Sequence, residues 1–149
     1  DNKEANAYFA KGNVYMKMKD FEQAEESYLR AIKLRPAAQF HNNLGWLYME
    51  KGELDKAEAS VKEAIASDPV ESYIYLDTLG MVQMKSGRYL DAEDAFISAT
   101  SGVPPGKEAA LTEIFAHLAE LYRTSGQPDK AVLIEDKLKE FTKAEKGGI

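Results

Sequence analysis

Cysteine is absent from the 149-residue sequence, and this excludes disulfide bonds, thiol chemistry and cysteine-ligated zinc. Only two histidines are present, His41 and His117, and neither has a second histidine at the spacing of a metal-binding pair. No run approaches the roughly 18 apolar residues that a membrane-spanning helix requires. We therefore expect no metal, no cofactor and no direct insertion into a membrane.

Positive charge is never concentrated in a block or stripe. The 25 acidic and 19 basic residues are scattered through the chain and give a formal net charge of −6. Proteins that bind nucleic acid carry a clustered basic surface, so we expect no nucleic-acid partner. The location stays open, because the sequence begins with Asp1 rather than methionine and a targeting sequence can have been removed. The absence of cysteine suits a bacterial cytoplasm and a bacterial periplasm equally well, and these are the two locations we expect.

Signals for catalysis are lacking as well. The stretch 102–108 contains two glycines and a lysine, as a phosphate-binding loop does. However, its glycine spacing is one residue short, and Glu108 stands where that loop requires Ser or Thr. Acidic residues are frequent, yet no pattern places two of them around a defined pocket. We therefore predict that the chain is not an enzyme.

Glycine, alanine and proline recur with a regular period. Gly12, Gly45 and Gly80 are 33 and 35 residues apart. Each is followed by one alanine after 12 residues, a second alanine after 19 and a proline after 24. Self-similarity at this period is typical of stacked helical repeats, which present extended binding surfaces. The recurring residues are Ala24, Ala57 and Ala92, then Ala31, Ala64 and Ala99, then Pro36, Pro69 and Pro104.

Each copy also opens with a similar motif. The first three motifs are Tyr8-x-x-Lys11-Gly12-x-x-Tyr15, His41-x-x-Leu44-Gly45-x-x-Tyr48 and Leu76-x-x-Leu79-Gly80-x-x-Gln83. A degenerate fourth copy opens with Phe115-x-x-Leu118-Ala119-x-x-Tyr122 and lacks the closing proline. These motifs resemble the tetratricopeptide repeat, a helix-turn-helix unit of about 34 residues. The resemblance covers the chain from about Ala5 to Phe141.

This resemblance implies an all-α fold, an α-solenoid of about four tetratricopeptide repeats wound into a right-handed superhelix. It implies a single domain over residues 1–149, with repeats at about 5–37, 38–71, 73–106 and 112–144. The residues agree with this fold, because small side chains let paired helices approach closely and proline ends one helix before the next begins. We expect helices near 5–18, 20–34, 38–51, 53–67, 71–86, 88–101, 108–125 and 127–144.

In tetratricopeptide proteins the first helices of successive repeats line a concave face, where ligand peptides usually lie. The helical period predicts which side chains of these helices face that groove. We expect the peptide-binding residues to be Phe9, Asn13, Met16, Lys17, Asn42, Trp46, Met49, Glu50, Asp77, Met81, Met84, Lys85, Glu120 and Arg123.

Methionine is concentrated in this groove set, which contains four of the five methionines of the chain. Met16, Met49 and Met84 share one repeat position, and Met81 shares another with Trp46, the only tryptophan. The opposite side of the same helices already supplies the core, so we expect the methionine stripe to be exposed in the groove. Methionine-rich exposed surfaces adapt to apolar partners. The alternatives are that the chain's own tail or a second copy covers the stripe.

The resemblance also bears on one known class of ligand. Family members that clamp the acidic tails of heat-shock chaperones use lysines, an arginine and two asparagines. Asn13 and Asn43 match the asparagines, but Phe9, Ile74 and Thr78 stand where the basic residues belong. We therefore expect no binding of chaperone tails.

The sequence favours a scaffold or adaptor that binds a protein or peptide partner in its concave groove. One alternative is a self-assembling structural module that forms homo-oligomers through its ends or its groove. A second alternative is an accessory tetratricopeptide domain of a longer protein.

Overall fold

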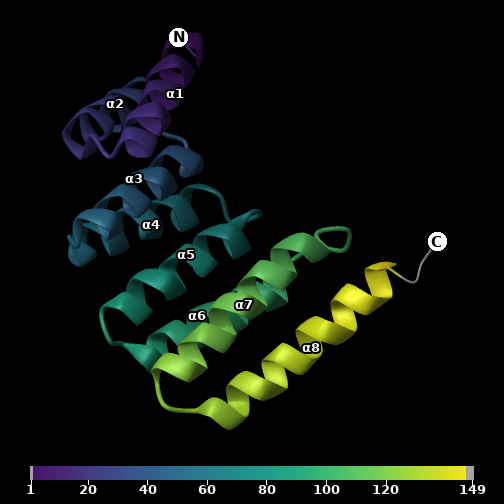
Figure 1. Ribbon diagram of the computed structural model, residues 1–149. Coiled ribbons are helices and arrows are strands. Elements are labelled where there is room, and N and C mark those ends of the chain that lie inside the picture. The colour runs from purple at the N-terminus through teal and green to yellow at the C-terminus, as the bar shows by residue number, and fades with distance from the viewer. Residues whose placement is uncertain (1, 147–149) are drawn as a thin grey trace.

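The computed structural model describes residues 2–146, and within this range the chain forms eight α-helices and no β-strand (Figure 1). The helices are α1 (Asn2–Met18), α2 (Phe21–Leu34), α3 (Ala38–Lys51), α4 (Leu54–Ser67), α5 (Ser72–Lys85), α6 (Tyr89–Gly102), α7 (Glu108–Thr124) and α8 (Pro128–Lys146). The all-α solenoid expected from the sequence is confirmed. The expected helix ends agree to within a few residues, and the largest difference is that α1 begins at Asn2 rather than near residue 5.

The same turn joins the two helices of every pair. Gly52, Gly87 and Gly126 adopt φ values of 77°, 74° and 76° just after the first helix of their pairs. A residue with positive φ lets the chain leave a helix while the next amide still bonds back into it. In the second pair, for example, the amide of Glu53 donates to the carbonyl of Tyr48 at 2.9 Å. Lys19 occupies the equivalent position of the first pair with φ 58°.

Glycine lets the two helices of a pair approach closely. A Cβ atom added to Gly12 would lie 2.5 Å from the ring of Tyr28, and one added to Gly80 would lie 2.6 Å from the ring of Phe96. Both distances are far below van der Waals contact, so only glycine fits at these positions. The ring from the second helix thus fills the space that the missing side chain leaves on the first.

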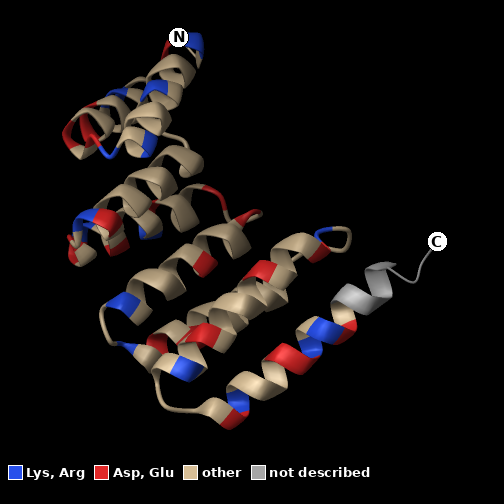
Figure 2. Ribbon diagram, viewed as in Figure 1, with Lys and Arg blue, Asp and Glu red and all other residues tan. Residues whose placement is uncertain are grey.

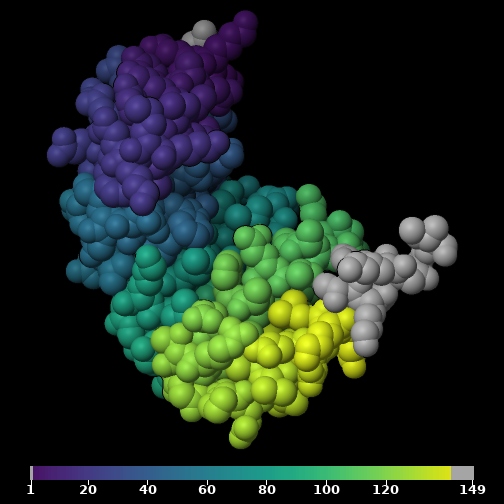
Figure 3. Space-filling view, viewed as in Figure 1, coloured from purple at the N-terminus to yellow at the C-terminus, as the bar shows by residue number. Residues whose placement is uncertain are grey.

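The first helices of successive pairs form an inner layer. α3 contacts α5, and α5 contacts α7, whereas α4 and α6 lie in an outer layer against the first helices on either side of them. The pairs stack in chain order into a curved body with α1 and α8 at opposite ends (Figures 1 and 3). The right-handed sense of the superhelix remains a prediction.

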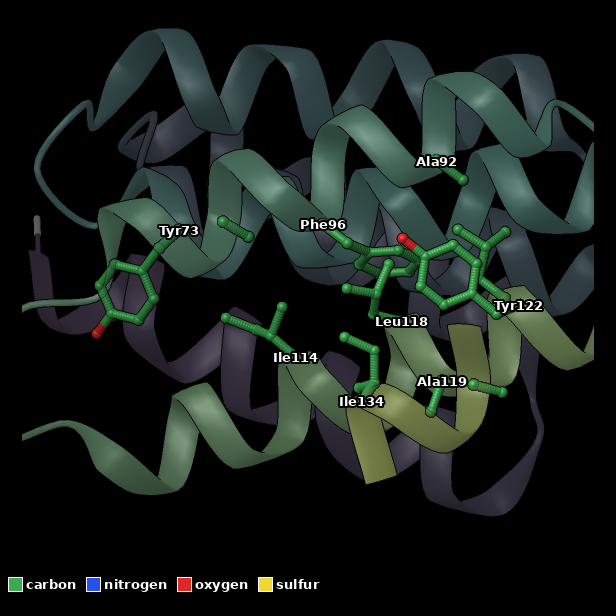
Figure 4. Close-up of a cluster of buried hydrophobic side chains, with 11 residues drawn as sticks. Tyr73, Ala92, Phe96, Ile114, Leu118, Ala119, Tyr122 and Ile134 are labelled. Carbon is green, nitrogen blue, oxygen red and sulfur yellow. The ribbon is translucent and has the colours of Figure 1, made fainter. Parts of the chain in front are cut away.

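Large apolar side chains fill the spaces between successive pairs. In the C-terminal half, Tyr73 from α5 and Phe96 from α6 lie in one cluster with Ile114 and Leu118 from α7 and Ile134 from α8 (Figure 4). These side chains are all buried. Because every helix of the two pairs contributes to this cluster, the pairs stabilise one another rather than folding as separate units.

Polar contacts also join neighbouring pairs, and they follow the repeat. Near the start of α2, Glu25 accepts hydrogen bonds from the hydroxyl of Tyr48 at 2.9 Å and from Lys51 Nζ at 2.6 Å. Two pairs further along, Glu93 accepts from the hydroxyl of Tyr122 at 2.7 Å and from Lys130 at 3.1 Å. Each glutamate lies one residue after the recurring alanine of its second helix, so the repeat itself places these contacts between pairs.

Candidate peptide-binding groove

A small cleft opens on the inner layer where α3, α5 and α7 meet. We call it the central cleft, and its volume is about 140 Å³. Its lining residues are Asn42, Trp46, Tyr73, Ile74, Asp77, Thr78, Ala110, Glu113 and Ile114. A second recess of about 370 Å³ lies beside it and is lined by Asn13, Met16, Lys17, Tyr28, Asn43 and Trp46. Trp46 lines both of them. A further hollow of about 580 Å³ adjoins the central cleft, shares Tyr73, Ile74, Ala110 and Glu113 with it, and is also lined by Lys107.

The residues expected in the groove differ widely in exposure. Two are buried, namely Asn42 and Met49. Seven are partly buried: Phe9, Asn13, Met16, Trp46, Asp77, Met81 and Met84. Five are exposed: Lys17, Glu50, Lys85, Glu120 and Arg123.

The expectation of an exposed methionine stripe is wrong for Met49, which is only 2% exposed. Met49 lies in a buried cluster with Val82 of the next repeat. Met16, Met81 and Met84 also pack against buried clusters and are only partly exposed. The physical reason is that neighbouring first helices contact each other, so a side chain aimed at the groove meets the next helix before it meets solvent.

Asn13 joins the first two repeats. Its Oδ1 accepts a hydrogen bond from the hydroxyl of Tyr28 at 2.7 Å and another from Asn43 Nδ2 at 2.9 Å. Both lone pairs of this oxygen are therefore engaged within the protein. Its carbonyl oxygen thus supports the shape of the groove rather than offering an acceptor to a ligand.

Charged side chains along the groove pair with one another. Lys85 lies 3.7 Å from Glu50, and Arg123 forms ion pairs with Glu120 and with Glu135. These pairs are exposed, so each contributes little to stability. They do, however, neutralise much of the charge at this part of the rim, and the acidic and basic residues are interspersed over the whole fold (Figure 2).

Asp77 and His117 form a pair that links α5 to α7. His117 Nδ1 lies 2.9 Å from Asp77 Oδ1 and 3.0 Å from Oδ2. The hydrogen bond to the Asp77 carboxylate raises the pKa of His117 above its ordinary value of 6.5, although partial burial acts in the opposite direction. The pair holds the carboxylate of Asp77 in the wall of the central cleft.

Three features of the central cleft were not expected from the sequence. Ile74 is 42% exposed, and Glu113 is exposed on the facing helix. Asn42 is 7% exposed, and its Oδ1 has no hydrogen-bond partner among the described residues. Ile74 lies three residues before Asp77, and Glu113 lies seven residues before Glu120. Extending the helical pattern of the groove residues by one turn and by two turns would therefore have found them.

The described part of the chain, residues 2–146, carries neither a membrane-spanning helix nor a metal-binding cluster. No helix there is long and apolar enough to cross a membrane. Residues 2–146 contain no group of three or more His, Asp and Glu side chains that could hold a metal ion.

Paired helices, recurring turns and a layered stack define an α-solenoid built from helix-turn-helix repeats. Residues 9–72 match the family model of the tetratricopeptide repeat. Cilia- and flagella-associated protein 70 from Homo sapiens and from Macaca fascicularis is 32% identical over 85 residues, which is 57% of this chain. The chain spans only 8% of the length of these relatives.

Solved structures share this fold. BtubC from P. vanneervenii superposes with a TM-score of 0.85 at 20% identity, over 97% of this chain and 65% of that one. The TPR2B domain of yeast Sti1, in its complex with pHsp70, superposes with a TM-score of 0.74 at 20% identity, over 84% of this chain and 98% of that one. At such identities the likeness shows the fold alone. The family match identifies tetratricopeptide repeats in residues 9–72, and the likeness to these structures extends the same fold over nearly the whole chain.

Proposed function

We propose that this protein binds a segment of a partner protein along its inner layer, with Trp46 and Ile74 as the main contact residues. The family and the fold support a protein–protein interaction module in general. The main observation in favour of binding in the groove is Trp46, because this large, partly exposed ring lines both recesses. Tryptophan is enriched among the residues that contribute most to binding energy at interfaces.

The binding mode that suits this surface is an extended or helical segment with apolar anchors. Ile74 gives the central cleft an exposed apolar edge at 42% exposure. Thr78 is buried, and its hydroxyl donates to the carbonyl of Ile74 at 3.3 Å, so it does not offer a hydroxyl donor to a ligand. With neither residue basic, an acidic tail has no obvious counter-charge in this part of the groove.

Selection of a random peptide library displayed on phage tests the proposal. Peptides that bind the wild-type chain should lose affinity for Ile74→Lys by at least about tenfold, as expected for loss of an interface anchor. Ile97→Lys is the matched control, because Ile97 is 46% exposed but lies on α6 in the outer layer. Equal binding to both variants, or failure of the library to yield any binder, would refute the groove assignment.

Trp46 supplies an independent signal, because it is the only tryptophan in the chain. Its fluorescence should shift when a selected peptide binds. Trp46→Ala should weaken binding by about 2 kcal/mol or more. Circular dichroism of this variant separates loss of affinity from loss of fold, since Trp46 also packs against a buried cluster.

A further inference from the structure

The central cleft has acidic and amide oxygens but no basic side chain in its lining. Asp77 contributes a carboxylate from α5, and Glu113 contributes another from α7. Among the described residues Glu113 has no ion-pair partner. Acidic segments on both helices are visible in Figure 2. His117 bonds to Asp77 and also interacts electrostatically with Glu113, but one protonated imidazole balances only one of the two carboxylates, so the cleft keeps a negative charge and favours a cation.

Asn42 provides a second, independent indication that a ligand donates a hydrogen bond in this cleft. This side chain lines the cleft and is 7% exposed, yet its Oδ1 has no hydrogen-bond partner in the described part of the chain. Buried amide oxygens are nearly always hydrogen-bonded, and one that is not raises the free energy of the folded state. A rotation of this amide towards a ligand breaks no existing bond to Oδ1.

The walls of the cleft suit the stem of a long side chain. Trp46 lines the cleft from α3, and Ile74 lines it from α5. An indole ring is the best aromatic partner for a cation, and an apolar wall accepts the methylene groups of lysine or arginine. The cleft itself measures about 140 Å³, which matches the end of a single side chain, and the adjoining hollow of about 580 Å³ leaves room for the segment that carries it.

We propose that the central cleft binds one basic side chain of the partner segment, with its head between Asp77 and Glu113 and its stem between Trp46 and Ile74. Arginine fits better than lysine, because its planar fork offers five donors to the carboxylates and to Asn42. This proposal rests on the proposed function, since it specifies what the groove recognises. A metal ion is disfavoured as occupant, because no metal-binding cluster exists among the described residues.

The experiment uses the tightest phage-selected peptide whose binding is lost with Ile74→Lys. Each lysine or arginine of that peptide is replaced by norleucine, which keeps the stem and removes the charge. We expect one such replacement to weaken binding at least about tenfold, and replacement by glutamate to weaken it further. Peptides that bind through the groove without any essential basic residue would overturn this inference and leave the proposed function intact.

Protein variants then locate the basic residue in the cleft. Glu113→Gln should weaken the binding of the unmodified peptide severalfold but leave the binding of the norleucine peptide unchanged. Such non-additive effects indicate direct coupling between the two groups. Asp94→Asn is the control, because Asp94 is an exposed carboxylate of α6 in the outer layer and does not line the cleft. Equal effects of these two variants would show that long-range charge, rather than the cleft, attracts the peptide and would refute the assignment.

Asn42→Leu gives a further readout that a merely structural asparagine would not give. The change is close to isosteric and removes an acceptor that has no partner. The variant should melt at the same or a higher temperature than the wild type, yet bind the arginine peptide more weakly. A lower melting temperature with unchanged affinity would mean that Asn42 serves the fold alone.

Discussion

At the scale of single residues, Lys19 is the point where one turn departs from the repeat. Its φ of 58° lies in the region that Gly52, Gly87 and Gly126 occupy in the other turns. A side chain in this region is disfavoured by contact with its own backbone. A Cβ atom added to Gly52 would have no atom within 4 Å. In this equivalent turn, therefore, no packing contact would offset the unfavourable backbone conformation of a residue with a side chain.

We predict that Lys19→Gly raises the free energy of unfolding by about 0.5–1 kcal/mol. Urea denaturation followed by circular dichroism measures the change. The reverse substitution Gly87→Lys should destabilise by a similar amount, because it places a side chain in the same backbone conformation. A Lys19→Gly protein that is less stable than the wild type would contradict this account.

The two histidines should respond to pH in opposite ways. The Asp77 carboxylate raises the pKa of His117 in the folded state, whereas burial lowers the pKa of His41. The stabilisation from the His117 pair is therefore complete below the unfolded pKa and is lost as pH rises through the folded pKa. Burial of His41 costs stability as pH falls through the unfolded pKa, because the folded state resists its protonation.

His117→Gln should consequently lower the free energy of unfolding more at acidic than at alkaline pH. His41→Gln should show the opposite trend and gain stability relative to the wild type as pH falls. Denaturation at several pH values around 6.5, together with NMR titration of both rings, tests these expectations. A His117 ring that titrates below the His41 ring would refute the assignment.

At the scale of helices, a glutamate near the start of α2 joins α2 to α3, and a glutamate near the start of α6 joins α6 to α7. Glu25 accepts from the hydroxyl of Tyr48, and Glu93 accepts from that of Tyr122. Burial together with the adjacent carboxylate raises the pKa of Tyr48 and of Tyr122 to about 12, so both hydroxyls remain donors at neutral pH. A hydrogen bond to a charged acceptor in a partly buried position contributes more than a neutral one.

We predict that Tyr122→Phe lowers the free energy of unfolding by about 1–2 kcal/mol, and Tyr48→Phe by a similar amount. Tyr15→Phe is the matched control. Tyr15 holds the same repeat position, but its hydroxyl has no hydrogen bond among the described residues. If thermal denaturation shows the same loss for Tyr15→Phe, the glutamate contacts are not the cause.

The helices were predictable from the sequence because their ends are marked locally. Glycine in three of the four turns within pairs, Lys19-Asp20 in the first turn and proline between pairs mark the places where the chain reverses. Contacts within the groove depend instead on how neighbouring pairs are placed. The burial of Met49 follows from the approach of α5 to α3. The pairing of Asp77 with His117 joins residues 40 positions apart, which no local pattern indicates.

At the scale of the whole molecule, the last described repeat differs from the others on the face that would meet a following helix. Arg123 holds the position of Met49 and Met84, and Glu135 holds that of Val61 and Phe96. Arg123 and Glu135 form an ion pair. Two apolar positions of the inner repeats are thus replaced by a charged pair, which makes this face of the described repeats more polar.

This pair makes end-to-end self-association through α7 and α8 unfavourable, because association would remove both charges from water. Restoring the apolar residues of the inner repeats with the double substitution Arg123→Met and Glu135→Val should expose a surface suited to stacking. We predict that sedimentation velocity shows concentration-dependent self-association for this double variant. The single substitution Lys85→Met is the control, since it also removes a charge near the groove but leaves the end face intact. Concentration-independent sedimentation of the double variant would show that other features of this face oppose stacking.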